Sequence, residues 1–242
     1  MTALAAERIK LFSTRSPWWC SALAIVLVVG MAALALATSP VDAGPVPPGL
    51  TAFLLQLGMV IVMVMAAVSV TTEYRFSTIR TTFQAVPNRA VALSAKTAVV
   101  TATAAVVGLL AGFGAWAAVW VLRPAQAVAL TDDATWRVVA GSGLVYAAAA
   151  VLAVAVGILV RQTAGAVSVL LVWALLAENL VGIIPGVGDD IVGWLPFVNA
   201  THFLGGDPAG GPFAPWGSLA YVAALAAGLL GVALLVADRR DA

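Results

Sequence analysis

Long apolar blocks alternate with short polar segments along the whole chain. Six blocks are long enough to cross about 30 Å of hydrocarbon as helices that rise about 1.5 Å per residue. These predicted spans cover residues 18–37, 50–72, 93–122, 136–160, 163–184 and 219–237. The pattern predicts an all-α membrane protein with six transmembrane helices, in which residues 1–242 form a single transmembrane domain.

The composition agrees with lipid as the solvent of this chain. Hydrophobic residues make up 62% of it and charged residues only 10%, whereas soluble domains have about 45–50% apolar and about 25% charged residues. The net charge is +1. Because no basic stripe is available to neutralise phosphates, the sequence gives no support to a nucleic-acid partner.

Lysine and arginine gather on one side of the predicted membrane. If the N-terminus is cytoplasmic, ten of the twelve lie inside, and only Arg123 and Arg137 lie outside. This positive-inside bias places both termini in the cytoplasm. The first span ends in Ala35-Leu36-Ala37, so cleavage as a secretory signal is an alternative, although its apolar run exceeds the roughly 7–15 residues of such signals.

The segment at 185–215, between the fifth and sixth spans, mixes glycine and proline with large apolar side chains. It is too apolar for a solvated loop and too interrupted for a span. We expect an outer re-entrant hairpin whose irregular backbone is buried in protein. A folded outer loop that caps the helices is the alternative.

Five residues are candidates for a substrate path. Gln56, Met59 and Met63 follow helical spacing in the second span and form an adaptable, polarizable stripe. Glu178 is the only acid inside a predicted span and has Asn179 as its neighbour. A membrane-embedded acid must face protein or water. Plain packing is the alternative for the stripe, and bonding to the outer hairpin is the alternative for Glu178.

Motifs of enzyme chemistry are missing from the sequence. It has no G-x-x-x-x-G-K-[ST] phosphate loop, no H-E-x-x-H and no G-x-S-x-G. His202 is the only histidine and Cys20 the only cysteine, so a histidine-rich or cysteine-rich metal site lacks ligands. We therefore expect neither an enzyme nor a cofactor bound by this chain.

The loop at 73–92, between the second and third spans, carries the strongest local pattern. Residues 71–89 read T-T-E-Y-R-F-S-T-I-R-T-T-F-Q-A-V-P-N-R. Ile79 and Phe83 share one helical face, and Pro87 ends the helix. The loop also supplies the charges of Glu73, Arg75, Arg80 and Arg89. This pattern predicts a short amphipathic helix that docks on something, rather than a solvated linker.

This loop resembles that of the ABC-2-type permeases, the six-span membrane subunits of bacterial ABC exporters. Their pattern T-x-E-Y-R-x-x-T-I-R-T-T, then P-x-R and A-K, is matched by Thr71, Glu73, Tyr74, Arg75, Thr78, Ile79, Arg80, Thr81, Thr82, Pro87, Arg89, Ala95 and Lys96. The segment E-R-I-K-L-F-S-T-R-S-P-W is similar to the family's basic lead-in helix, which we expect within residues 1–17. Phe76-Ser77 departs from the His-Gly pair of many relatives.

The resemblance implies a coupling helix at about residues 73–84 that docks in a separate ATP-binding subunit. The coupling residues that it implies are Glu73, Tyr74, Arg75, Thr78, Ile79, Arg80 and Phe83. It also implies a second permease chain, identical or related, in a bacterial plasma membrane, with ATP and Mg held by the ATP-binding subunit. The expected function is the membrane-spanning permease subunit of an ATP-driven exporter, and the apolar composition favours a lipophilic substrate.

Two other functions remain open at this point. One is a non-pumping resistance, immunity or assembly factor that binds a lipid-linked or peptide partner. The other is a secondary transporter driven through Glu178, but such transporters are built from internal repeats and broken helices, and neither is evident in the sequence.

Overall fold

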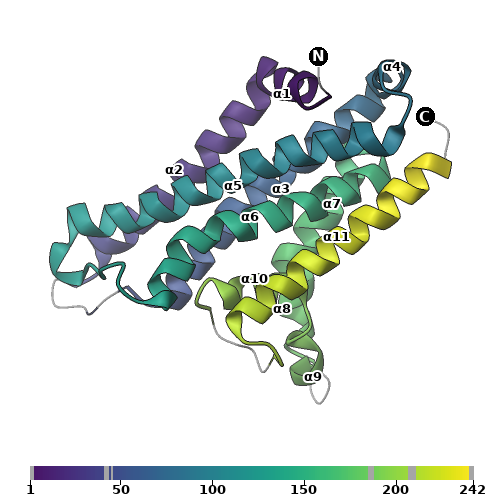
Figure 1. Ribbon diagram of the computed structural model, residues 1–242. Coiled ribbons are helices and arrows are strands. Elements are labelled where there is room, and N and C mark those ends of the chain that lie inside the picture. Colours follow the sequence, from purple (N-terminus) through teal and green to yellow (C-terminus); the bar gives the residue numbers. More distant parts are fainter. Residues whose placement is uncertain (1–2, 41–43, 45, 185–187, 207–210, 240–242) are drawn as a thin grey trace.

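The computed structural model describes residues 3–40, 44, 46–184, 188–206 and 211–239, and this part of the chain is helical without any strand. Six of its helices are long and apolar enough to cross a membrane (Figure 1), which confirms the predicted number. They are α2 (Arg15–Thr38), α3 (Pro48–Arg75), α5 (Arg89–Leu122), α6 (Asp133–Val160), a composite helix at Thr163–Val181, and α11 (Pro215–Arg239).

The composite helix consists of three consecutive pieces. They are α7 (Thr163–Val172), the π-helical turn η2 (Trp173–Ala177) and α8 (Glu178–Val181). The shorter elements are α1 (Ala3–Ser13), α4 (Thr78–Ala85), η1 (Pro124–Gln126), α9 (Gly188–Val192) and α10 (Pro196–Phe203). Figure 1 shows α1, α4 and the end of α11 at one end of the bundle, with α9 and α10 toward the other.

Helix α6 runs through the middle of the bundle and packs against α3, α5, α7 and α11. Small residues make its contact with α5 close. Gly108 and Gly112 of α5 form a G-x-x-x-G pattern against the first half of α6, and Ser142 Oγ donates a 2.8 Å hydrogen bond to the Gly108 carbonyl. A Cβ atom on Gly108 would lie 2.7 Å from the Ser142 carbonyl oxygen. These glycines therefore serve a helix contact within the chain.

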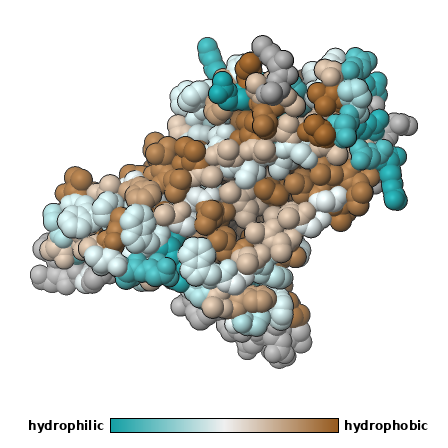
Figure 2. Space-filling view, viewed as in Figure 1, coloured by the Kyte–Doolittle hydropathy of each residue, from teal (hydrophilic) through white to brown (hydrophobic). Residues whose placement is uncertain are grey.

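Large apolar side chains cover the outside of the bundle, and Figure 2 shows them across the visible face, with hydrophilic residues at the end that carries α1 and α4 and a smaller hydrophilic patch toward the opposite end. Six of the seven exposed tryptophans lie near the two ends of the bundle, and the seventh, Trp173, lies within the fifth span. Trp18 and Trp19 lie at the α1 end, and Trp120, Trp136, Trp194 and Trp216 lie at the other. Tryptophan belts at two levels are typical of the two membrane interfaces.

The segment between the fifth and sixth spans contains α9 and α10. Residues 185–187 and 207–210 of the expected hairpin lie outside the described residues. Helix α10 packs on α11 and on the nearby ends of α3 and α6, with Phe197 and Phe203 buried. Apolar anchoring of this kind gives the segment a fixed place at its end of the bundle.

Candidate functional site

Helix α4 is a short helix separated from α3 by a sharp turn. Helix α3 ends at Arg75, so residues 73–75 belong to the second span and not to the short helix expected at 73–84. Ser77 has a φ of 58°, a left-handed conformation that interrupts the helical path. After α4, the Asn88 side chain accepts a 3.1 Å hydrogen bond from the Val91 amide and begins α5.

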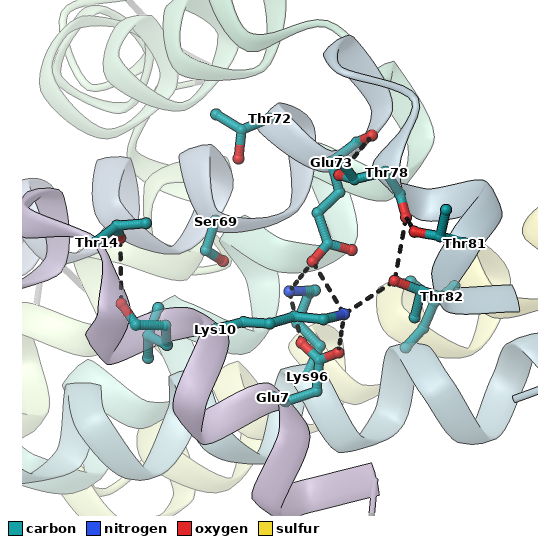
Figure 3. A network of polar contacts seen from close by, with 12 residues as sticks. Glu7, Lys10, Thr14, Ser69, Thr72, Glu73, Thr78, Thr81, Thr82 and Lys96 are labelled. Carbon is teal, nitrogen blue, oxygen red and sulfur yellow. Dashed lines mark hydrogen bonds and ion pairs between the residues drawn. The ribbon is translucent and has the colours of Figure 1, made fainter. Parts of the chain in front are cut away.

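Four charged side chains form a charge cluster (Glu7, Lys10, Glu73 and Lys96) beneath α4, drawn in Figure 3. Lys96 Nζ lies 2.7 Å from Glu7 Oε2 and 2.9 Å from Glu73 Oε1. Lys10 Nζ lies 2.6 Å from Glu7 Oε1 and 3.4 Å from Glu73 Oε1. Two acids and two bases thus balance, as buried charges require.

The charge cluster connects four helices. Glu7 and Lys10 come from α1, Glu73 from the last turns of α3, and Lys96 from the second turn of α5. Lys10 Nζ also donates a 2.9 Å hydrogen bond to the Thr82 hydroxyl of α4. A displacement of α4 or α1 therefore moves charges that are bonded to two membrane-spanning helices.

Burial makes these contacts strong. Glu7 is 4% exposed and Lys96 is 6% exposed, so both charges depend on protein partners rather than water. Burial raises the pKa of Glu7, but the ion pairs with Lys96 and Lys10 outweigh it, and the pKa lies below its ordinary value. Burial lowers the pKa of Lys10, whereas Glu7 and Glu73 raise it further, so the net direction is upward. Glu7 and Lys10 therefore stay charged at neutral pH.

The seven predicted coupling residues fall on different faces. Ile79 is buried, and Glu73 faces inward with a side chain that is 12% exposed. Tyr74 and Phe83 are half-buried beneath the guanidinium groups of Arg161 and Arg89, at 5.0 and 5.3 Å from the ring centres. The exposed members are Arg75, Thr78 and Arg80.

The outward surface of α4 and the preceding turn (the α4 face: Arg75, Phe76, Thr78, Arg80 and Thr81) combines charge, hydroxyl groups and one aromatic ring. Phe76 is 67% exposed, with the Arg75 guanidinium 5.5 Å from its ring centre. Beneath this face, Ile79 packs into the main apolar core. The α4 face is thus a polar and aromatic surface held on a fixed support.

In the described part of the chain, none of the five predicted path residues lines either of the two main cavities. Met59 and Met63 are fully buried in the core, and Gln56 donates a 3.3 Å hydrogen bond to the Ala174 carbonyl. Asn179 is exposed and bonds the Leu175 carbonyl at 2.8 Å. None of the five lines the large cavity at the end of the bundle opposite the charge cluster.

Glu178 is bonded to the segment that contains α9 and α10. Its Oε1 accepts from the Trp173 indole at 2.8 Å and from the Phe197 amide at 3.1 Å, and its Oε2 accepts from the Val198 amide at 2.8 Å. The two amides belong to the first turn of α10, where a carboxylate satisfies free N–H groups and suits the helix dipole. These are the contacts that the alternative to a path role expected, in which Glu178 bonds the segment between the fifth and sixth spans.

Sequence reasoning placed Glu7, Lys10 and Lys96 in the lead-in and loop motifs but did not pair them. The ion pair between Glu7 and Lys96 joins residues that are 89 positions apart in the sequence (96 − 7). No local periodicity predicts such a contact. One signal was available. Lys96 follows the apolar start of a membrane helix, where a charge needs a partner, and Glu7 is the only acid before the first span.

Comparison of the chain with models of known protein families and with curated proteins gave no match. The resemblance of residues 71–96 to the ABC-2-type permeases therefore stays a prediction from those motifs. What the structure adds is the placement of these residues: one part of the motif is exposed on the α4 face, and another part is buried in the charge cluster beneath it.

Proposed function

We propose that this protein is the membrane-spanning permease subunit of an ATP-driven ABC exporter. A separate ATP-binding subunit binds the α4 face and holds ATP and Mg, and a second permease chain, identical or related, completes the path. The termini and α4 lie in the cytoplasm of a bacterium, the segment with α9 and α10 re-enters the membrane from the outer side, and a lipophilic substrate moves outward.

The observation that carries the proposal is the support of α4. A short amphipathic helix exposes polar and aromatic residues on one side, while its other side is bonded to α1 and, through Lys10, to the charge cluster of α3 and α5. A partner that pushes on the α4 face moves these helices together. ATP-driven closure of two partner subunits is thereby converted into a change between two arrangements of the spans.

Each part of the loop motif then has its own role. Phe76, Arg75 and Thr81 contact the ATP-binding subunit. Glu73 and Lys96 are positioning residues, because they face inward and hold the α4 face at its angle to the spans. Changes at the two groups are therefore expected to differ: surface changes weaken partner binding, and changes in the charge cluster weaken the transmission of motion.

The test is co-purification of the solubilised chain with a co-encoded ATP-binding subunit. We expect the wild-type chain to retain the partner and the variant Phe76→Ser with Thr81→Arg to lose it. The control is Phe53→Ser, which removes another exposed phenylalanine, 52% exposed, from the opposite end of α3. The control is expected to bind normally.

Reconstituted complexes give the second measurement. Lipophilic compounds should stimulate ATP hydrolysis by the wild-type complex, and Glu73→Gln should bind the partner but lose most of this stimulation. If no co-encoded ATP-binding subunit associates with the wild-type chain, the exporter proposal is wrong. If a partner binds and no compound stimulates hydrolysis, a non-pumping binding factor is the better description.

A further inference from the structure

A cavity of about 870 Å³ lies at the end of the bundle opposite the charge cluster. Parts of α2, α3, α5, α6 and α10 line it, and most of its wall is apolar, including Ala35, Leu36, Leu54, Leu55 and Ala115. Cavities of about 300–1,000 Å³ with apolar walls and a few polar groups are typical of small-molecule sites. The cavity is thus large enough for one ligand with a long apolar part.

Arg137 lies in the wall of this cavity without a counter-ion. Within the described residues, no carboxylate lies within ion-pair distance of its guanidinium group, and its Nε is buried without a hydrogen-bond partner. Among the described residues, the ring that this guanidinium contacts is that of Phe203, 6.0 Å from the ring centre. The aromatic contact does not replace the hydrogen bond that Nε loses on burial, so this half-buried guanidinium is incompletely compensated.

The neighbouring polar groups leave this positive charge in place. Asp132 also lines the cavity, but its two oxygens accept hydrogen bonds from the Thr135 amide and hydroxyl, at 3.0 and 2.8 Å. His202 lines the cavity with its Nδ1 3.1 Å from the Ser218 hydroxyl. Burial and the charge of Arg137 lower the pKa of His202, so at neutral pH it is an uncharged hydrogen-bonding group beside the arginine.

We propose that this cavity binds an amphiphile with one apolar chain and one negatively charged head group. The head group pairs with Arg137 and hydrogen-bonds His202, and the chain lies along the apolar wall of α2, α3 and α5. An anionic head group supplies the counter-ion of Arg137. A cationic head group would be repelled, and an uncharged one would leave the positive charge of the guanidinium without a counter-ion. This site requires no ATP-binding partner and is independent of the proposed exporter function.

The test compares three probes with the same twelve-carbon chain, laurate, dodecanol and dodecylammonium. Equilibrium binding of each radiolabelled probe is measured on the full chain in nanodiscs of zwitterionic lipid, with empty nanodiscs subtracted. We expect saturable binding of laurate at least about tenfold tighter than that of dodecanol, since a charge-assisted hydrogen bond contributes about that factor or more. Dodecylammonium is expected to bind more weakly than dodecanol.

Three variants separate charge from shape. Arg137→Gln should reduce laurate affinity about tenfold and leave dodecanol unchanged, and Arg137→Lys should restore most of the preference. Ala35→Phe fills the cavity and should weaken both probes. Arg123→Gln removes a cation from the same end of the bundle outside the cavity lining and is the control that should keep the laurate preference.

The proposal is overturned by any of three results. They are no saturable laurate binding to the wild-type chain, equal affinities for laurate and dodecanol, and an unchanged laurate preference in Arg137→Gln that still folds. Folding of each variant is judged by its elution as a single species, and folding of the Arg137 variants also by their unchanged dodecanol affinity. A failed exporter test leaves this measurement interpretable, because no partner subunit is present in it.

Discussion

Replacing Lys96 by methionine removes the central cation of the charge cluster while keeping the length and helix propensity of the side chain. Glu7 then retains only Lys10 at 2.6 Å, and Glu73 retains only Lys10 at 3.4 Å. One half-exposed lysine must serve two carboxylates that are almost out of contact with water. We expect the free energy of unfolding to fall and α1 to become loosely attached.

The size of the effect follows from the distances. At 2.7 and 2.9 Å, each attraction between Lys96 and a carboxylate corresponds to about 6 kcal/mol at an effective dielectric constant of about 20. Burying the three charges costs several kcal/mol per ion and offsets most of this. Removal of one partner from a buried pair typically costs about 3–5 kcal/mol. Because Lys10 remains, we expect about 3 kcal/mol, or roughly two powers of ten in the unfolding equilibrium.

Two assays follow this change. The eight tryptophans report global unfolding in mixed micelles through their fluorescence. Hydrogen–deuterium exchange reports α1 itself, and it should rise within residues 3–13 well before global unfolding. Arg8→Met is the matched control, since Arg8 is an exposed cation of α1 outside the charge cluster; its cost should stay within about 0.5 kcal/mol.

A double variant sharpens the test. In Glu7→Gln with Lys96→Met, one acid and one base are removed together, and Lys10 is left to pair with Glu73. The double variant should lose about 1–3 kcal/mol less unfolding free energy than the sum of the losses in the two single variants, as expected of groups in one network. A cost for Lys96→Met no larger than that of Arg8→Met would refute the buried-network interpretation.

Three further predictions concern pH and packing. Glu7 contributes its full stabilisation above pH 4.5 and loses it as pH falls through its lowered folded-state pKa, while Lys10 contributes fully below pH 10.5 and loses this as pH rises through its raised pKa. The melting temperature should therefore fall at both low and high pH. Glu7→Gln should make the fall at low pH smaller. Gly108→Ala places a methyl group against the Ser142 carbonyl and should cost about 1–3 kcal/mol in denaturant titrations. Glu178→Ala leaves two α10 amides unbonded. It should lower the free energy of unfolding by about 2–4 kcal/mol and increase amide hydrogen exchange at 197–199, with a smaller effect for Glu178→Gln.

The sequence predicts the spans because a membrane helix needs a continuous apolar surface, and that need is visible residue by residue. The helix ends follow other rules. Helix α5 begins at Arg89, before its apolar run at 93, because the Asn88 cap and the Pro87 break fix the start. Helix α8 ends at Val181, short of the expected 184, where apolar residues continue in a non-helical turn.

Only part of the candidate site can be predicted from the sequence, and the reason is physical. The amphipathic pattern of α4 is local, and Ile79 is buried as the pattern indicates. The direction of Glu73 depends on Lys96 and Lys10, which lie far away in the sequence, so its inward position could not be derived from the loop alone. For Glu178, the choice between two roles depended on the position of α10, which only the folded structure supplies.

The spread of the charge cluster along the sequence has a consequence for synthesis. A ribosome makes Glu7 and Lys10 long before Glu73 and Lys96, and at about 5–20 residues per second the delay is several seconds. During that interval, the acid of α1 has a lysine of its own helix as its only cluster partner. Helix α1 can therefore complete its charge pairs only after the start of the third span has been made, so its docking follows the synthesis of residues far behind it in the sequence.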